Sequence, residues 1–335
     1  MHQLGHWLRQ RSHRFSALLA VGLSVSLAIG ACSTETAPTP AASPSATPAT
    51  QAQVVRIGYQ KFGTLNIVKA RGGLEKRLQP LGVTVEWSLF PAGPQLLEGL
   101  NVESIDLGHT GEAPPIFAQA AGTPLVYVGN EPASPASEAI LVPANSPIKA
   151  VADLKGKKVV LNKGSNVHYL LVRAIEDAGL QLSDVESIFL PPADARVAFE
   201  QGAADAWVIW DPFFAAAEQQ IGAKVLRDGQ GLVANREFYL GSRAFAAANP
   251  KIIEEVLAEI AAVDDWAEAN PDKVAEILSP QLNIDVPTLK TVVQRRDYGV
   301  EPISDAVLAD QQKIADTFTK LQLIPKSIDV KEATL

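Results

Sequence analysis

The sequence predicts an α/β fold of two lobes, each a mostly parallel sheet flanked by helices, with two crossovers forming a hinge. Short β-rich runs alternate with helical patterns over much of the chain, which indicates parallel strands joined by helices. The body after the N-terminal segment has about 280 residues, which exceeds one comfortable core and favours two domains. Three of the predicted strands, at Val55–Tyr59, Ile105–Gly108 and Lys158–Leu161, each lead through a loop of small residues into a helix start.

The N-terminal segment predicts export and lipidation. Three arginines, Arg9, Arg11 and Arg14, precede an apolar run over 17–29 that is short for a membrane span. The run ends at Gly30-Ala31-Cys32, which resembles a bacterial lipobox and implies a signal peptide over 1–31 with lipidation of Cys32. An ordinary signal peptide is the alternative. The Ser, Thr, Pro and Ala of residues 32–53 predict a solvated tether behind the anchor.

The first lobe is expected over 54–142 and 238–335. Its strands are short β-rich runs, predicted at Val54–Tyr59, Thr84–Phe90, Ser104–Gly108, Leu125–Val128 and Glu138–Val142. Its first helices are predicted at Leu65–Leu78, Gln95–Asn101 and Ala113–Ala121. Pro114 and Pro115 suit a first helical turn, because their missing N–H groups would be unpaired there anyway.

The second lobe is expected over 143–237, where the same alternation starts again. Its strands are predicted at Lys158–Leu161, Ser187–Leu190, Ala206–Trp210 and Lys224–Leu226. Its helices are predicted at 151–156, Ser165–Ala178, Asp194–Gln201 and Phe213–Ile221, and Gly179 and Gly202 follow two of them as stop signals.

The chain after Phe238–Ser242 is predicted to be helical. Apolar residues at helical spacing begin after Asn249-Pro250, and further helices are predicted from Pro271 to Leu278, Val286 to Arg296 and Ser304 to Leu321. We expect this tail to cover the sheet of the first lobe; the alternative is a separate helical domain.

Composition excludes several functions. Without residues 1–32 the chain has 26 basic and 37 acidic residues, a net charge of −11, which argues against nucleic acid as a partner. Cys32 is the only cysteine, so the chain can form no internal disulfide. Only His109 and His168 follow the signal segment, and no His/Cys cluster has the spacing of a metal site. We therefore predict no metal, no cofactor and no catalytic residue.

The three helix starts predict a binding site for an anion. A helix N-terminus leaves backbone N–H groups unpaired and carries partial positive charge. Ligands of open parallel sheets bind beyond the carboxyl ends of the strands. Two lobes facing each other would bring these loops into one cleft, and closure about the hinge would enclose the ligand.

Five sequence blocks resemble the aliphatic sulfonate-binding proteins of bacterial ABC importers. The blocks are Gly111–Ala120, Val151–Val159, Asn162–Tyr169, Leu190–Arg196 and Trp207–Pro212. The resemblance covers nearly the whole body, from about Val55 to Leu323. It implies the two-lobed periplasmic binding protein fold of the second type. It also implies a monomer in the periplasm or cell envelope that delivers an aliphatic sulfonate to a permease and an ATPase on other chains.

A sulfonate has three acceptor oxygens and suits a cradle of N–H and O–H donors. We expect Thr110, Gly111 and Glu112 at one wall, with the Glu112 backbone N–H as its useful group. Ser165 and Asn166 are expected on the second lobe, where Gly164 lets the backbone approach closely. The remaining candidate contacts are Gln60 as a donor, Trp210 against the alkyl part, Asp211, and Tyr239 as a roof.

Each candidate also has a purely structural alternative. Ser165 and Asp211 could cap their own helices, and Thr110 could bond within its turn. Gln60 could face solvent, while Trp210 and Tyr239 could serve packing alone. The same fold could instead bind taurine, nitrate, bicarbonate or a pyrimidine precursor. A desulfinase-like enzyme is disfavoured, because such enzymes use a cysteine nucleophile and the body contains none.

Overall fold

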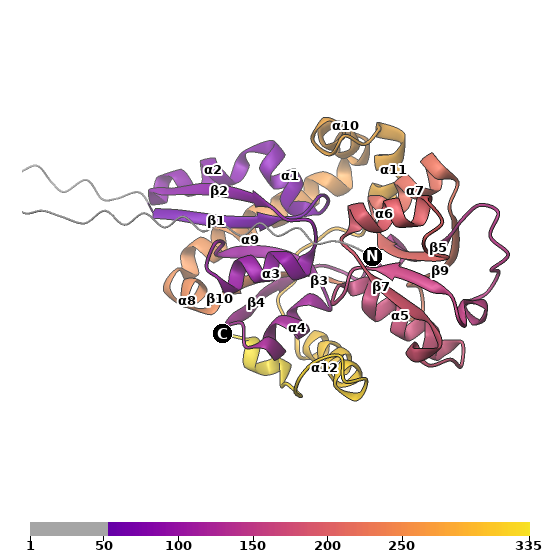
Figure 1. Cartoon of the computed structure of the whole chain (residues 1–335). Helices are drawn as coiled ribbons and strands as arrows, with labels where there is room; N and C mark the ends of the chain where they lie inside the picture. The colour runs from indigo at the N-terminus through magenta and orange to yellow at the C-terminus, as the bar shows by residue number, and fades with distance from the viewer. Residues whose placement is uncertain (1–52) are drawn as a thin grey trace, which may run out of the picture. The chain divides into compact units, whose positions relative to one another are not determined.

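Two five-stranded sheets organise the part of the chain that the computed structural model describes, residues 53–335 (Figure 1). In both sheets four strands run in one direction and one runs against them, so the predicted mostly parallel α/β fold is confirmed. The expectations for the signal peptide, for lipidation of Cys32 and for nearly all of the tether lie outside the described residues.

The first sheet has the order β2-β1-β3-β10-β4. Its strands are β1 (Gln53–Tyr59), β2 (Val83–Leu89), β3 (Leu107–Gly111), β4 (Leu125–Asn130) and β10 (Glu237–Ser242). The prediction for β3 was displaced by three residues, since the strand continues to Gly111 and pairs with the antiparallel β10 over Leu107–Gly111. Thr110 and Gly111 therefore lie in the strand and not in the loop after it.

The second sheet has the order β7-β6-β8-β5-β9. Its strands are β5 (Glu138–Val142), β6 (Lys158–Leu161), β7 (Glu186–Phe189), β8 (Ala206–Trp210) and β9 (Lys224–Asp228). The sequence placed β5 in the first lobe, but β5 pairs with β8 and β9 of this sheet. The chain thus changes sheets before Glu138, because a short, fully buried run fits either sheet and only its pairing decides.

Helices cover the two sheets and connect their strands. They are α1 (Thr64–Arg71), α2 (Gly73–Leu78), α3 (Gly93–Asn101), α4 (Pro114–Ala121), α5 (Asn166–Asp177), α6 (Pro192–Glu200), α7 (Phe213–Ile221), α8 (Arg243–Ala248), α9 (Pro250–Ala269), α10 (Pro271–Leu282), α11 (Val286–Gln294) and α12 (Asp305–Lys320). Gly72 separates α1 from α2 with a φ of 62°, a left-handed conformation that favours glycine.

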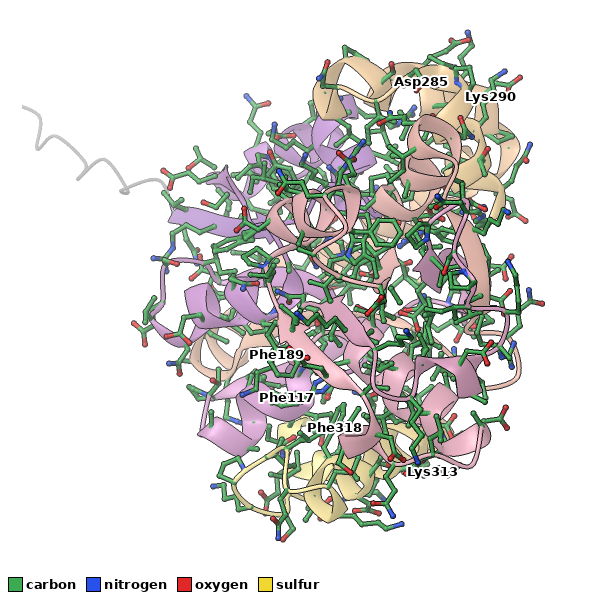
Figure 2. All side chains as sticks on the ribbon, turned by 45° about the vertical axis from the view of Figure 1, so that its right-hand side comes forward. Phe117, Phe189, Asp285, Lys290, Lys313 and Phe318 are labelled. Carbon is green, nitrogen blue, oxygen red and sulfur yellow. The ribbon has the colours of Figure 1, made fainter. Side chains whose placement is uncertain are left out.

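The C-terminal helices contact the helices of both sheets. As predicted, α9 and α10 pack on α1 and α2, and their apolar residues join one core with β1. By contrast, α11 packs against α7, and Phe318 of α12 contacts His168 and Tyr169 of α5. Figure 2 shows Phe318 beside Phe117 of α4, whose ring centroid lies 4.9 Å away. The tail therefore joins the two sheets in addition to covering the first.

Within residues 53–335, no helix combines the length and the apolar character needed to cross a bilayer.

Candidate ligand-binding site

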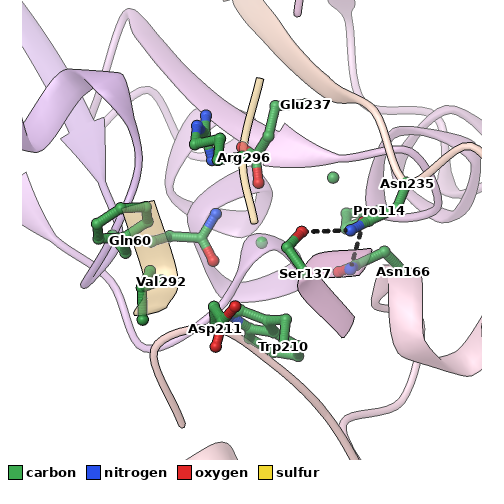
Figure 3. A pocket seen from close by; sticks show the side chains of 13 residues that line it. Gln60, Pro114, Ser137, Asn166, Trp210, Asp211, Asn235, Glu237, Val292 and Arg296 are labelled. Carbon is green, nitrogen blue, oxygen red and sulfur yellow. Dashed lines mark hydrogen bonds between the residues drawn. The ribbon is translucent and has the colours of Figure 1, made fainter. Parts of the chain in front are cut away.

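A pocket lies at the ends of strands from both sheets (Figure 3). Gln60 follows β1, Gly111 ends β3 and Trp210 ends β8. The lining residues are Gln60, Phe62, Gly93, Gly111, Pro114, Ser137, Asn166, Trp210, Asp211, Asn235, Glu237, Val292 and Arg296. The pocket is therefore lined by residues of the three predicted loops and by residues of other segments.

Helix starts from both sheets face this pocket. Gly93, Pro114 and Asn166 are the first residues of α3, α4 and α5, and all three line it. Among the described residues, the backbone N–H of Ala113 just before α4 has no backbone partner. Such unpaired N–H groups at a helix start attract an anion.

The Gln60 loop is held against β3 through His109. The side-chain amide of Gln60 donates to the His109 carbonyl oxygen at 3.0 Å, and its backbone N–H donates to His109 Nε2 at 3.4 Å. Because Nε2 accepts, Nδ1 carries the imidazole proton and donates to Glu237 Oε2 at 2.6 Å. Burial opposes ionisation of Glu237, but His109 and Arg296 outweigh it and hold the pKa of Glu237 below its usual value.

Arg296 is the cation that lines the pocket. Its side chain is 8% exposed and donates to the Glu131 carboxylate, which also accepts from the Tyr239 hydroxyl. The pKa of Glu131 is raised by burial, although Arg296 opposes this shift. A buried ion pair with a further hydrogen bond fixes the position of the guanidinium.

The opposite wall consists of neutral side chains that bond to one another. The Asn166 amide donates to Glu138 and, at 2.9 Å, to Asn235 Oδ1. Asn235 in turn donates to the Ser137 hydroxyl at 2.9 Å. Burial raises the pKa of Glu138 well above its ordinary value, and the neighbouring Glu112 raises it further. Burial therefore disfavours a negative charge on Glu138 in this wall.

Trp210 and Asp211 close the pocket below β8. The ring of Trp210 stands edge-on to Phe213 with centroids 6.4 Å apart. Asp211 Oδ1 accepts from the Ala215 backbone N–H at 3.0 Å and lies 3.4 Å from Arg295. Burial raises the pKa of Asp211 to about 7 against the lowering effect of Arg295. Asp211 thus lines the pocket and also accepts a backbone N–H from the first turn of α7, whose N-cap residue is Pro212.

Five of the predicted site residues line the pocket: Gln60, Gly111, Asn166, Trp210 and Asp211. The other five lie behind the walls or beside them. Ser165 donates to the Asn162 carbonyl oxygen, and Gly164 is positioned against the Phe117 ring. Thr110 donates to the Gly111 carbonyl oxygen and is fully buried. Gly164 and Ser165 therefore shape the loop before α5, and Thr110 is held inside the strand β3.

Glu112 and Tyr239 are also buried behind the pocket. Glu112 Oε2 accepts from the Arg236 backbone N–H at 3.3 Å, and burial raises the pKa of Glu112 to about 7. Tyr239 lies in β10, within the sheet, and not as a roof at the hinge.

The sequence analysis missed eight lining residues, namely Phe62, Gly93, Pro114, Ser137, Asn235, Glu237, Val292 and Arg296. Gly93 and Pro114 open helices as the named candidates do, so that signal could have found them. Arg296 and Val292 come from the tail, where the sequence shows only an amphipathic helix. Among the described residues no group of three or more His, Cys, Asp or Glu could hold a metal ion.

Comparisons with known proteins identify the family. The NMT1/THI5-like family model matches residues 89–274. A relative from Escherichia coli (strain K12), named for binding aliphatic sulfonates, is 46% identical over 283 residues, which are 84% of this chain and 88% of the relative.

Two solved structures of sulfonate-binding proteins have the same fold. The alkanesulfonate-binding protein SsuA from Xanthomonas axonopodis pv. citri, bound to MOPS, is 39% identical with a TM-score of 0.82, covering 86% of this chain and 99% of that chain. The periplasmic aliphatic sulphonate binding protein SsuA from Escherichia coli is 45% identical with a TM-score of 0.77, covering 84% of this chain and 92% of that chain. The chain therefore belongs to the NMT1/THI5-like family and, within it, to the family of aliphatic sulfonate-binding proteins.

Proposed function

We propose that this chain is the solute-binding component of an ABC importer, located in the periplasm, and that it captures aliphatic sulfonates in the pocket between its two sheets. The observation that carries the proposal is the convergence of three helix starts from both sheets on one pocket beside Arg296. The relatives named for binding alkanesulfonates support it over most of the chain's length.

The chemistry of a sulfonate fits these donors. Its three oxygens accept hydrogen bonds and carry one permanent charge, which helix-start N–H groups and one guanidinium can balance. In this proposal Gly111 and Asn166 approach the sulfonate from the two sheets, and Gln60 and Arg296 complete the cradle. The Trp210 ring contacts the alkyl part, and the remaining predicted residues, Thr110, Glu112, Gly164, Ser165 and Tyr239, support the walls.

The proposal extends to residues before the described part. Cys32 carries a lipid that anchors the protein to a membrane, and the tether up to residue 53 gives the body reach. The body acts as a monomer, with two lobes that close on the sulfonate and pass it to a permease and an ATPase on other chains. We assign no enzymatic step, because the relatives that cover most of the chain are named as binding proteins.

The test is a ligand panel measured on the purified full chain by calorimetry and thermal unfolding. Alkane-1-sulfonates of one to six carbons, with and without amino groups, are compared with alkane carboxylates of equal length, nitrate and bicarbonate. A ligand at 100 times its Kd stabilises the folded state by about 2.7 kcal/mol, so the true ligand class raises the melting temperature clearly. Stronger stabilisation by carboxylates, nitrate or bicarbonate than by every sulfonate would refute the proposal.

Gly111→Ala tests the position of the pocket. A Cβ at Gly111 would lie 2.9 Å from Asn166 Cγ, so the two sheets could not present their donors at the present spacing. We expect sulfonate affinity to fall about tenfold or more, the equivalent of about 1.4 kcal/mol. The matched control is Gly129→Ala, where the nearest atoms lie 3.3 Å from the added Cβ and outside the pocket. Equal affinities of the two variants would place the sulfonate elsewhere.

A further inference from the structure

The charges that face the pocket do not cancel. Of its charged lining residues, Arg296 is paired with Glu131, and Asp211 is met by Arg295 and the Ala215 N–H. Glu237 Oε2 accepts a hydrogen bond from His109 Nδ1 at 2.6 Å, and His109 Nε2 accepts the Gln60 N–H at 3.4 Å. The Arg296 charge acts on both the Glu131 and the Glu237 carboxylates, so one guanidinium faces two carboxylates and this wall keeps an excess of negative charge.

Glu237 also has an acceptor left for a ligand. Its Oε2 accepts from His109 at 2.6 Å, and among the described residues no hydrogen bond reaches Oε1. The side chain is 25% exposed and lies among the side chains that line the pocket in Figure 3. Asp211 is less suited to the same task, because its side chain is only 3% exposed.

The sheet register places this charge next to the expected anion position. Glu237 of β10 pairs directly with Gly111 of β3, and paired residues of antiparallel strands lie about 5 Å apart. A sulfonate bound at Gly111 would therefore lie close to a carboxylate. Like charges at that separation repel strongly where little water screens them, so a simple alkanesulfonate meets a penalty that an adjacent ammonium group would remove.

We propose that Glu237 makes this pocket selective for aminoalkanesulfonates, with an ammonium group two or three carbons from the sulfonate that bonds to Glu237 Oε1. The proposal rests on the proposed function and names its substrate class. The sulfonate occupies the helix starts and Arg296, and the ammonium group lies against Glu237. A short spacer is required because Glu237 and Gly111 are paired neighbours.

The experiment compares two ligands of nearly the same shape on the full chain. 3-Aminopropane-1-sulfonate and butane-1-sulfonate differ by an ammonium group in place of a methyl group. We expect the unmodified chain to bind the amine about 10- to 100-fold more tightly by calorimetry, the range for a hydrogen bond between charged groups. N-acetyl-3-aminopropane-1-sulfonate, which keeps the nitrogen without its charge, should lose this advantage.

Glu237→Gln should remove the preference by weakening binding of the amine and strengthening binding of butane-1-sulfonate. Glu86→Gln is the matched control, because Glu86 is an exposed residue of β2 outside the pocket, and it should keep the preference. Equal or tighter binding of butane-1-sulfonate by the unmodified chain would overturn the inference, and so would an unchanged preference in Glu237→Gln. The ligand comparison on the unmodified chain decides even if the variant does not fold. Binding of neither sulfonate would refute the proposed function itself, and the inference with it.

Discussion

The side chains of the two pocket walls are held in place by different kinds of interaction. The wall of the first sheet and the tail holds charged side chains, with Arg296 fixed by Glu131 and Glu237 fixed by His109. The wall of the second sheet is a chain of neutral hydrogen bonds from Asn166 through Asn235 to Ser137. Both walls contribute helix starts, but only the first carries full charges into the pocket, apart from Asp211 at the base.

Because of this difference, substitutions on the charged wall should affect the free energy of unfolding as well as ligand binding, whereas substitutions on the neutral wall should cost less. On the charged wall, removing one partner leaves a buried charge, so a substitution affects folding as well as binding. On the neutral wall, a lost contact costs one hydrogen bond or part of an apolar surface, which is much less. The three predictions below test this division, from the largest expected effect to the smallest.

Arg296→Met should be the most damaging of these changes. Glu131, with a side chain 2% exposed, would lose its cation, and breaking a buried ion pair costs about 3–5 kcal/mol. Urea unfolding measures the loss. Adding Glu131→Gln to the variant should restore much of the stability, because the stranded charge is then gone.

Arg196→Met is the control for an arginine in a more exposed pair. Arg196 bonds to Glu200, and both side chains are about one-third exposed. Pairs of this kind contribute about 0–1 kcal/mol. If Arg296→Met were no worse than Arg196→Met, the charged wall would not depend on its ion pair.

Glu112→Gln should change how stability depends on pH. Burial raises the pKa of Glu112 to about 7, above the 4.5 of an ordinary glutamate, so the folded state holds a proton that the unfolded state releases. This group therefore lowers the stability of the native chain as the pH rises from about 4.5 to 7, by about 3 kcal/mol in total. Glutamine cannot ionise, so the stability of the variant should fall less than that of the native chain over this pH range.

Urea unfolding at several pH values between 4 and 8 tests this, with Glu86→Gln as the exposed control. The variant and the native chain should agree most closely at the acidic end and diverge as the pH rises. A constant difference across the range would mean that Glu112 does not retain a proton in the folded state.

Trp210→Phe should have the smallest effect on the free energy of ligand binding and a clear effect on tryptophan emission. Trp210 is half-buried and lines the pocket, whereas Trp207, three residues earlier, is fully buried beside Phe199. We expect Trp210→Phe to remove most of the change in tryptophan emission on adding a saturating sulfonate, with affinity altered by about threefold or less.

Trp207→Phe is the matched control and should keep the emission change while costing more stability, because Trp207 packs in the core of the second sheet. An emission change that survives in Trp210→Phe would move the ligand away from β8.

The fold was predictable from the sequence because its signals are local. The alternation of β-rich and helical runs predicted nearly all strands and helices, and the small-residue loops predicted the helix starts that meet at the pocket. Gln60, Gly111 and Asn166 were found because they adjoin these helix starts. The assignment of β5 was wrong because its five buried residues suit either sheet.

The charged members of the site could not be predicted in the same way. Arg296 follows a helix of the tail, and its partner Glu131 lies 165 residues earlier in the chain. Glu237 meets His109 only because β10 pairs antiparallel with β3. No local spacing in the sequence carries either relationship.

The sequence by itself determined the alternation of elements, the sites where helices begin and the family resemblance, because residue type and spacing fix the local backbone. Only the tertiary structure decided which sheet receives β5, which carboxylates have raised pKa values and which cation faces the pocket. Those outcomes depend on burial and on partners from distant segments, whose electrostatic cost is set by the folded surroundings and not by neighbours along the chain.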